Sequence, residues 1–595
     1  MSYKNYILVC GGTGCESSKA DAIYKSILQQ LEKRGLSKEA QVVKTGCFGF
    51  CEKGPIVKVL PDESFYVKVT PDDAQEIVAE HIEKGRKVER LLYNNTASKE
   101  HTKIDDLDFY QKQFRIVLRN CGFINPEDIS EYIARDGYLA LEKVLFEMKP
   151  EDVINELKTA GLRGRGGAGF ATWMKWNFTK DVKEDQKYIV CNADEGDPGA
   201  YMDRSTLEGD PHSILEAMAI AGHTVGANQG YIYIRAEYPL AINRLKIAIN
   251  QARENGLLGK DILGSGFDFD IEIRLGAGAF VCGEETALLA SLEGKRGMPI
   301  PRPPFPAVKG LWGKPTVINN VETYASVPVI IAKGGKWFAS IGTETSKGTK
   351  VFALTGKINN SGLIEVPMGT TLREIIYDIG GGIPGGKKFK AVQTGGPSGG
   401  VITADYLDTP IDYENLQKLG SIMGSGGMIV MDEDDCMVDV TKFYLEFTVD
   451  ESCGKCAPCR IGGRQLHTLV EKVTKGTAEE KDIKKMRQLS HAMRKASLCG
   501  LGQTAPNPVI STLTYFEDEY MTHIRDGKCP ARKCTDLLSF SILPDKCIGC
   551  GLCAKKCPVN AITGEKRQAH GIDSALCIKC GECEQVCKFN AVIRE

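Results

Sequence analysis

The alternation of apolar runs and amphipathic stretches predicts a multidomain protein of mixed α/β and α+β class. Near the N-terminus, short apolar runs of strand type enclose a stretch with apolar residues at helical spacing. The elements expected there are a strand at 6–9, a helix at 16–34, a hairpin at 56–69 and a helix at 71–84. From Phe114 the alternation continues, and the elements expected are strands at 188–191, 230–235 and 267–275 and a helix at 241–254.

Three glycine-bearing loops lie in this second region. They are GLRGRGGAGF (161–170), CNADEGDPGAYMDR (191–204) and GAGAFVCGEE (276–285). Glycine lets backbone N–H groups approach an anion closely, and ligands of open α/β sheets bind at the carboxyl ends of the strands. The first loop matches neither GxxxxGK[ST] nor GxGxxG, so its composition alone is also compatible with a plain loop.

Length and charge narrow the class of protein. The 595 residues suffice for roughly three to six domains, and the chain carries 75 basic and 77 acidic side chains. A net charge near zero gives no reason to expect nucleic acid or an anionic membrane surface as a partner. The sequence lacks an apolar run of the ~20 residues that span a bilayer and a signal-peptide pattern, so we expect a cytoplasmic protein without a membrane span.

The 22 cysteines are the strongest chemical signal. In a large chain without a secretion signal, clustered cysteines are more often metal ligands than disulfides. Cys10-x4-Cys15 and Cys47-x3-Cys51 place four thiols on two loops of the N-terminal region. This spacing favours a [2Fe-2S] cluster over zinc, which usually takes closer pairs, and over a CxxC redox pair.

Fourteen further cysteines lie between Cys453 and Cys587. A CxxCxxC triplet with one more cysteine about forty residues later supplies the thiolates of a [4Fe-4S] cluster, namely Cys453, Cys456, Cys459 and Cys499. The tail holds two CxxCxxCxxxC runs, and in two-cluster ferredoxins the fourth cysteine of each run ligates the other cluster. The predicted sets are Cys547, Cys550, Cys553 and Cys587 for one [4Fe-4S] cluster and Cys577, Cys580, Cys583 and Cys557 for the other.

Cys529 and Cys534 belong to none of these sets. They could form a mononuclear zinc site with His570 and His467, because imidazole and thiolate ligands mix readily on zinc. Two free thiols are an equally good interpretation.

Five motifs together resemble the flavin and nucleotide site of the complex I NADH-binding subunit, a family that includes diaphorase subunits of hydrogenases and formate dehydrogenases. They are GLRGRGGAGF, CNADEGDPG, GAGAFVCGEETALL, PRPPFPA and GLWGKPTVINNVET, and the match extends from Phe114 to Arg525. The N-terminal cysteines resemble those of the thioredoxin-like [2Fe-2S] ferredoxin domain. The segment VFALTGKINNSGLIEVPMGTTLREIIYDIGGG resembles the ubiquitin-like soluble-ligand-binding domain of the same family.

The resemblance implies sites for FMN and for NAD(H) or NADP(H). The residues expected at FMN are Gly164, Gly166, Lys175, Asn192, Asp194, Glu195, Phe280, Gly283, Glu284, Asn319 and Asn320. Those expected at the dinucleotide are Phe170, Phe178, Asp197, Glu285, Arg302 and Phe305. Arg302, Phe280 and Asp197 replace the lysine, tyrosine and glutamate usual in the respiratory branch, so either dinucleotide stays open. Although Glu195 and Glu285 lie nearby, no catalytic acid or base is expected, because the cofactors supply the chemistry.

The motifs also set the predicted domain boundaries. We expect a thioredoxin-like [2Fe-2S] domain at 1–93, a linker at 94–113, an FMN and NAD(P) domain at 114–345, a ubiquitin-like domain at 346–427, a helical [4Fe-4S] domain at 428–528, a linker with the possible zinc site at 529–540 and a two-cluster ferredoxin domain at 541–595. The GGPSGG stretch at 395–400 is interpreted as a solvent turn.

The domain order most resembles the beta subunit of multimeric, often electron-bifurcating [FeFe]-hydrogenases and of their NADP-reducing relatives. The resemblance implies hydride exchange between NAD(P)H and FMN and single-electron transfer through one [2Fe-2S] and three [4Fe-4S] clusters. The partners implied are a catalytic [FeFe]-hydrogenase subunit, a small thioredoxin-like [2Fe-2S] subunit and ferredoxin, in a hetero-oligomer suited to anaerobic metabolism. The alternatives are the diaphorase subunit of an NAD-dependent formate dehydrogenase and a non-enzymatic iron–sulfur relay without flavin.

Overall fold

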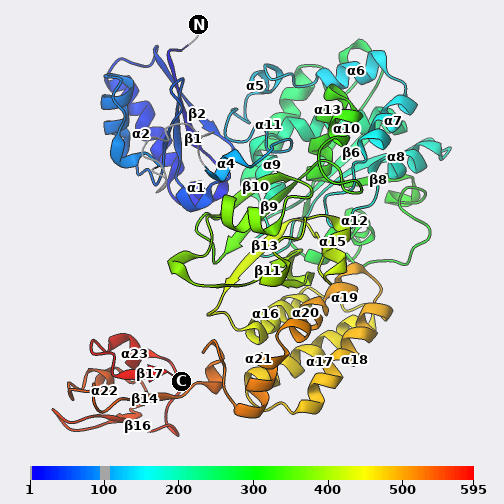
Figure 1. Ribbon diagram of the computed structural model, residues 1–595. Helices are drawn as coiled ribbons and strands as arrows, with labels where there is room; N and C mark the ends of the chain where they lie inside the picture. The colour runs from blue at the N-terminus through cyan, green and yellow to red at the C-terminus, as the bar shows by residue number, and fades with distance from the viewer. Residues whose placement is uncertain (1–2, 94–107, 595) are drawn as a thin grey trace. The chain divides into compact units, whose positions relative to one another are not determined.

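The structure is a computed structural model that describes residues 3–93 and 108–594. It divides into two compact units. The first extends up to Val430 apart from residues 388–390, and the second contains those three residues and the chain from Met431 onward. Figure 1 shows the first unit in blue to yellow-green and the second in yellow to red.

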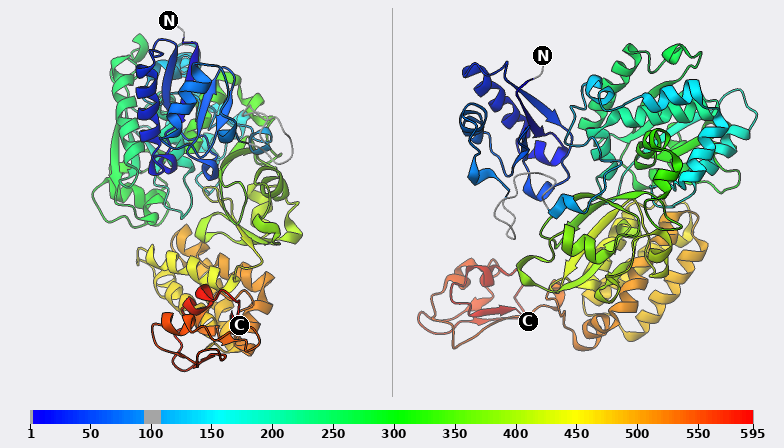
Figure 2. Two further views of the ribbon diagram at one scale, coloured as in Figure 1. Left: turned by 90° about the vertical axis from the view of Figure 1, so that its left-hand side faces the viewer. Right: turned by 45° about the horizontal axis from the view of Figure 1, so that its top comes forward.

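The N-terminal domain is a four-stranded sheet in the order β2-β1-β3-β4, with helix α2 (Ala20–Lys33) packed against it (Figure 2). Its strands are β1 (Asn5–Cys10), β2 (Ala40–Thr45), β3 (Val57–Leu60) and β4 (Ser64–Tyr66). β1 pairs in parallel with β2 and antiparallel with β3. Ile23, Ile27 and Leu31 recur at helical spacing, and their burial on one face of α2 closes the core.

Two helices of this domain differ from those predicted from the sequence. The stretch expected as one helix at 16–34 forms α1 (Thr13–Ser17) and α2, because Lys19 at φ 71° interrupts it. The helix expected at 71–84 begins as α3 (Asp73–Glu76) and continues as a wider helical turn at Ile77–Ile82.

Part of the predicted linker is helical. Residues 94–107 lie outside the described residues, but Asp108–Gln111 form α4. The ring of Phe109 stacks on Phe50 at 4.2 Å, and the hydroxyl of Tyr110 donates a hydrogen bond to the carbonyl of Phe48 at 2.9 Å. Aromatic packing therefore fixes residues 108–111 against the N-terminal domain, which corrects the linker prediction there.

The central domain is built on a parallel sheet in the order β7-β6-β5-β8. Its strands are β5 (Tyr188–Ala193), β6 (Gln229–Arg235), β7 (Asp270–Gly276) and β8 (Thr316–Asn320). The predicted strands and the predicted helix at 241–254 correspond to β5, β6, β7 and α11 (Pro239–Glu254). The other helices are α5 (Ile129–Ile133), α6 (Leu139–Glu147), α7 (Pro150–Ala160), α8 (Thr172–Asp181), α9 (Met202–Gly209), α10 (Pro211–Val225), α12 (Glu285–Leu292), α13 (Val321–Lys333) and α14 (Gly335–Ala339).

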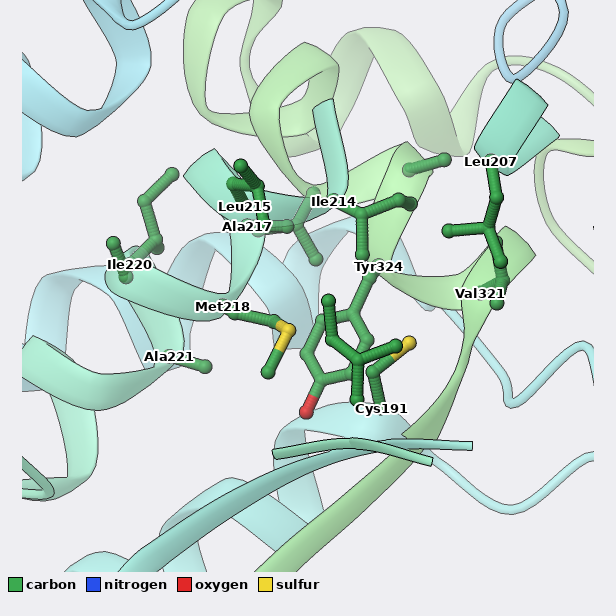
Figure 3. Packing of buried hydrophobic residues seen from close by; sticks show 14 of the residues in the cluster. Cys191, Leu207, Ile214, Leu215, Ala217, Met218, Ile220, Ala221, Val321 and Tyr324 are labelled. Atoms are coloured by element: carbon green, nitrogen blue, oxygen red, sulfur yellow. The ribbon is translucent and has the colours of Figure 1, made fainter. Parts of the chain in front are cut away.

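Helices α10 and α13 form the buried layer over the sheet. Figure 3 shows Tyr324 of α13 beside Met218 of α10 and above Cys191 of β5, with Leu207 of α9 next to Val321. The hydroxyl of Tyr324 donates to the carbonyl of Val190 at 3.2 Å, so this buried polar group has a partner.

The ubiquitin-like region is a five-stranded sheet in the order β10-β9-β13-β11-β12. Its elements are β9 (Thr349–Gly356), β10 (Gly362–Pro367), β11 (Phe389–Thr394), β12 (Val401–Thr403), α15 (Tyr413–Lys418) and β13 (Gly427–Asp432). β13 pairs in parallel with β9, so the predicted boundary at 427/428 is wrong and the sheet runs on to Asp432. The solvent-turn prediction is wrong as well, because residues 395–400 are buried.

The second unit contains a helical bundle and a small β-rich tail. The bundle helices are α16 (Met437–Asp450), α17 (Ala457–Thr474), α18 (Glu480–Ala496), α19 (Gly500–Thr504), α20 (Asn507–Tyr515) and α21 (Glu517–Met521). The tail pairs β14 (Phe540–Ile542) with β17 (Val592–Arg594) and β15 (Ile562–Thr563) with β16 (Gly571–Ile572), and it adds α22 (Leu552–Lys556) and α23 (Glu582–Val586).

Residues 529–534 are part of the bundle. Cys529 and Cys534 are both buried in its apolar core, which corrects the prediction of a linker at these positions. Within the described part of the chain, no helix combines the length and the apolar character needed to cross a membrane.

Candidate functional site

The carboxyl ends of β5 and β8 bring the glycine-bearing loops together. Asn192 at the end of β5 donates a side-chain hydrogen bond to the carbonyl of Gly283 at 2.8 Å and accepts one from the backbone N–H of Asp194 at 3.1 Å. Asn320 ends the neighbouring strand β8. Parallel pairing therefore places the second and third loops at the edge where open α/β sheets bind ligands.

The first loop approaches this edge at main-chain distance. The N–H of Gly164 donates to the carbonyl of Phe170 at 2.8 Å and closes the loop. A Cβ atom on Gly166 would lie 3.1 Å from Cβ of Asn320, and Gly167 adopts φ 120° against the backbone of Gly424. A side chain at 166 would press on Asn320 and one at 167 on the backbone of Gly424, which explains the glycines.

Lys175 and Trp176 of α8 form one wall of the site. The ammonium of Lys175 lies 3.2 Å from the carbonyl of Ile318 and 3.2 Å from the carboxylate of Glu285. The indole N–H of buried Trp176 donates to the side-chain oxygen of Asn319 at 3.0 Å. These bonds hold α8 against the end of β8.

Glu285 lies between two cations. It contacts Lys175 and also forms an ion pair with Arg302. Burial raises the pKa of this carboxyl, but the two cations outweigh burial and lower its pKa overall. Glu285 is therefore a carboxylate at neutral pH.

Three aromatic residues expected at the dinucleotide are unusually exposed. Phe170, Phe178 and Phe305 expose 45%, 46% and 54% of their surface. The guanidinium of Arg302 lies 5.8 Å from the ring centre of Phe305. Flat apolar rings can stack on the planar rings of a dinucleotide, and a cation beside them can bind its phosphates.

The second loop gathers buried carboxyl groups. Glu195 accepts hydrogen bonds from the backbone N–H groups of Asp203 and Arg204, both at 3.2 Å. Asn320 donates to the carboxylate of Asp203 at 2.5 Å. Burial raises the pKa of Glu195 to about 7 and that of Asp197 to about 6.

Two predicted flavin residues also have local structural roles. Glu284 caps α12 by accepting from the N–H groups of Thr286 and Ala287 at 2.9 and 3.0 Å. Phe280 lies so close to Gly196 that a Cβ atom there would be 2.8 Å from its ring. The structure thus brings predicted flavin residues of all three loops to one end of the sheet, a region called the crevice below, and gives some of them a local structural role.

The ubiquitin-like region and Asp203 contribute contacts that were not predicted from the sequence. A Cβ atom on Gly396 would lie 2.6 Å from the carboxylate of Asp197, which also accepts from the hydroxyl of Ser425 at 2.6 Å. The available signal was a glycine cluster directly after a strand at 389–394, the same arrangement that marked the other loops. Asp203 lies inside the quoted second loop and was passed over.

The four N-terminal cysteines lie together. The thiol of Cys10 contacts those of Cys15 and Cys47, and Cys47 in turn contacts Cys51. Contact with Cys15 and burial raise the pKa of Cys10 well above its ordinary value. Four crowded thiols of this kind can lose their protons only if a cation takes their place, as a [2Fe-2S] cluster does.

The bundle brings the triplet cysteines near the fourth. The thiol of Cys459 lies 3.2 Å from the hydroxyl of Ser452. Gly502 lies three residues after Cys499, and a Cβ atom on it would lie 2.9 Å from Cβ of Cys459. Helix α19, which begins next to Cys499, is thus packed against the triplet.

The tail forms two cysteine-lined cavities. One is lined by Cys547, Cys550, Cys553 and Cys587, and the other by Cys557, Cys577, Cys580 and Cys583. Each cavity combines three cysteines of one run with the last cysteine of the other, as two [4Fe-4S] clusters require.

Cys529 and Cys534 meet ligands other than those predicted. With Cys436 and His523 they form a buried group whose ligand atoms all lie within 4.8 Å of one another. His467 is on α17 and outside this group, and His570 lines the cavity of Cys547, so both are corrected as zinc ligands.

The geometry of this group is suited to zinc. Nε2 of His523 lies 3.4 Å from the sulfurs of Cys436 and Cys534, and its Nδ1 contacts the carbonyl of Glu519 at 2.7 Å. Three cysteines and one histidine are a common zinc set, and the carbonyl orients the imidazole as a second-layer partner does. Cys436 was missed because it stands almost a hundred residues before Cys529.

Five family models match regions of the chain. Residues 157–329 match the Nuo51 FMN-binding domain, 439–523 the NADH-ubiquinone oxidoreductase-F iron–sulfur binding region and 351–402 the SLBB domain. Residues 2–81 match the thioredoxin-like [2Fe-2S] ferredoxin, and 540–563 and 570–593 each match the 4Fe-4S binding domain.

Curated relatives cover most of the chain. The NADP-reducing hydrogenase subunit HndC of Solidesulfovibrio fructosivorans is 62% identical over 460 residues, which are 77% of this chain and 94% of that protein. The chain belongs to the complex I 51-kDa-like flavoprotein family. An NADH-quinone oxidoreductase subunit of Aquifex aeolicus, another member, is 46% identical over 412 residues, or 69% of this chain and 95% of that protein.

A solved structure extends the likeness to the fold. The NAD+-reducing [NiFe]-hydrogenase in its air-oxidized state matches with a TM-score of 0.61 and 28% identity, covering 88% of this chain and 86% of the other. The chain is therefore an oxidoreductase of this family, with FMN-binding, [2Fe-2S] and [4Fe-4S] domains.

The raised pKa of Glu195 predicts a pH-dependent stability difference. Its carboxyl group has an ordinary pKa of 4.5 and a folded pKa of about 7, so its burial disfavours the folded protein increasingly as the pH rises from 4.5 to 7. Glu195→Gln removes this ionisation. Its amide has a single acceptor oxygen and so keeps only one of the two backbone hydrogen bonds, a cost that does not depend on pH. We expect the stability of the variant relative to wild type to increase as the pH rises across that interval, measured by anaerobic thermal unfolding at several pH values. A constant difference at every pH would contradict the assignment.

Proposed function

We propose that the chain is the diaphorase subunit of a multi-subunit hydrogenase that exchanges electrons between a nicotinamide dinucleotide and iron–sulfur clusters. One observation carries the proposal: a crevice with glycine loops and exposed aromatic rings shares the chain with four separate cysteine sets of cluster type. A hydride carries two electrons, whereas an iron–sulfur cluster accepts one, so a flavin between them supplies the conversion. Cytoplasmic location stays a prediction.

The residues of the crevice are suited to bind and orient rather than to react. Gly164 and Gly166 let the main chain approach the FMN, while Lys175 supplies a positive charge near its edge. Phe170 and Phe178 provide flat surfaces for the dinucleotide. No side chain needs to move a proton for hydride exchange.

The ion pair between Glu285 and Arg302 affects whether the site prefers NAD or NADP. A carboxylate at the ribose favours the 2′-hydroxyl of NAD, whereas an arginine accommodates the 2′-phosphate of NADP. Here the two side chains pair with each other, so a 2′-phosphate would have to compete with Glu285 for the guanidinium. Viologen reduction assayed with NADH and NADPH separately distinguishes the two preferences.

Gly166→Val tests the crevice. Its side chain would collide with Asn320 and displace the loop from the end of β8, so we expect loss of FMN and at least a hundredfold loss of NAD(P)H-dependent viologen reduction. The [4Fe-4S] signals of the tail should remain in the electron paramagnetic resonance spectrum. Gly571→Val is the matched control, because a Cβ atom there meets nothing within 4 Å. Normal FMN content and turnover in Gly166→Val would refute the proposed site.

The partner is proposed to be a catalytic [FeFe]-hydrogenase subunit, together with a small thioredoxin-like [2Fe-2S] subunit and ferredoxin. Support comes from the relative named as an NADP-reducing hydrogenase subunit, which matches 77% of this chain. A formate dehydrogenase partner would leave every residue assignment unchanged, and identification of the co-purifying subunits separates the two. A relay without flavin is disfavoured by the preserved crevice, and an FMN content near zero after anaerobic purification would support it.

Electron bifurcation is part of this proposal and has its own test. We expect the complete complex to reduce NAD(P)+ with hydrogen only when oxidised ferredoxin is reduced alongside, because one flavin-based reaction would then divide the electron pair. The measurement is hydrogen-dependent reduction of each acceptor alone and of both together. Independent reduction of each acceptor would rule bifurcation out.

The bundle is proposed to hold one structural zinc ion on Cys436, His523, Cys529 and Cys534. Support comes from the closed four-ligand group, since a site with all positions filled by protein has no place for substrate. Such an ion would tie the start of α16 to the segment after α21.

Metal analysis tests the ligand set. Cys529→Ser/Cys534→Ser and His523→Ala should each lose the zinc, because removal of one or two ligands weakens a four-coordinate site by orders of magnitude. His467→Ala and His570→Ala are matched controls that should keep it. An unchanged zinc content in the double cysteine variant would refute the proposed site. Loss of zinc from His467→Ala or His570→Ala would instead support the ligands first predicted from the sequence.

A further inference from the structure

Helix α9 connects the second flavin-crevice loop to the N-terminal cysteine domain. It begins directly after Tyr201, the end of the loop that carries Glu195. Its residue Leu207 is packed in the core that Figure 3 shows, so the helix is held from within its own domain. Both ends of α9 contact the N-terminal domain.

The carboxyl end of α9 binds the loop between the first two cysteines. Glu208 is 1% exposed and accepts hydrogen bonds from the backbone N–H and the hydroxyl of Thr13 at 3.1 and 2.5 Å. The guanidinium of buried Arg244 donates to the carbonyl of Glu208 at 2.6 Å. Thr13 lies between Cys10 and Cys15, so this buried network fixes the loop of two thiols.

The second cysteine loop touches α9 at main-chain distance. A Cβ atom on Gly46 would lie 2.4 Å from Cα of Gly209, so the two backbones are in direct contact. Gly46 immediately precedes Cys47. The two domains are therefore packed together through both cysteine loops.

The amino end of α9 reaches a cysteine sulfur directly. The hydroxyl of Tyr201 donates a hydrogen bond to the sulfur of Cys51 at 3.5 Å. The guanidinium of Arg204 lies 5.6 Å from the centre of the Tyr201 ring and helps to hold it. Within the N-terminal domain itself, the N–H of Gly49 donates to the sulfur of Cys47 at 3.3 Å.

A donor on a ligand sulfur changes the energy of a cluster. Reduction adds negative charge to the iron–sulfur unit, and part of that charge resides on its sulfurs. A hydrogen bond to sulfur stabilises the reduced form more than the oxidised form and so raises the reduction potential. A donor that belongs to the flavin-crevice loop makes this potential depend on the neighbouring domain.

We propose that Tyr201, through its hydrogen bond to the sulfur of Cys51, raises the reduction potential of the N-terminal [2Fe-2S] cluster. The inference rests on the proposed ligation by Cys10, Cys15, Cys47 and Cys51. The observation that carries it is the hydrogen bond from the Tyr201 hydroxyl to the sulfur of Cys51.

The test is a redox titration of Tyr201→Phe. The full chain is purified anaerobically, and the [2Fe-2S] signal is followed by electron paramagnetic resonance at a temperature that broadens the [4Fe-4S] signals. We expect a lower midpoint potential than in wild type, with FMN content and all cluster signals retained. Tyr66→Phe is the matched control: it removes a buried hydroxyl that bonds to His81 in the same domain, and its potential should equal that of wild type.

Each other outcome overturns the proposal. An unchanged potential in Tyr201→Phe shows that the hydrogen bond does not tune the cluster, and an equal shift in Tyr66→Phe shows a nonspecific effect. Loss of the [2Fe-2S] signal in Tyr201→Phe also counts against tuning, because all four thiols remain. Absence of the signal from wild type would instead contradict the ligand assignment in the proposed function.

Discussion

The parallel pairing of β5 with β8 is the constraint on which the flavin crevice depends. It places Asn192 and Asn320 at one edge of the sheet, and the side chains of both bind neighbouring loops. The first loop can then approach Asn320 to the limit set by a missing side chain at Gly166. Loops from distant parts of the chain share one crevice because the ends of parallel strands coincide.

The crevice is shared with the ubiquitin-like region. Gly396 and Ser425 enclose Asp197, whose burial raises its pKa to about 6. A region expected to be only a scaffold thus sets the dielectric surroundings of a residue expected near the nicotinamide. Most of its sheet is part of the first unit together with the central and N-terminal domains.

Thiol crowding is the second physical theme of the molecule. Buried sulfurs in contact oppose one another's ionisation, as the raised pKa values of Cys10 and Cys47 show. A bound metal ion would remove this conflict by replacing the protons with positive charge. At each cysteine group, the free energy of metal binding would therefore contribute directly to the stability of the surrounding fold.

Sequence alone was sufficient wherever ligands lie close together in the chain. The CxxCxxC spacings confine three sulfurs of each proposed [4Fe-4S] set to one turn of backbone, so these triplets, like the glycine loops, could be proposed before any fold was known. The strands β5, β6 and β7 followed from apolar runs for the same local reason.

Only the tertiary structure decided the contacts between distant segments. Cys436 and His523 join Cys529 because helix packing in the bundle brings α16 beside the segment after α21, and no local pattern records that packing. The same holds for Gly396 at Asp197 and for Tyr201 at Cys51. Short-range spacing determines which chemistry a segment can perform, whereas the burial of apolar surface between segments determines which groups meet.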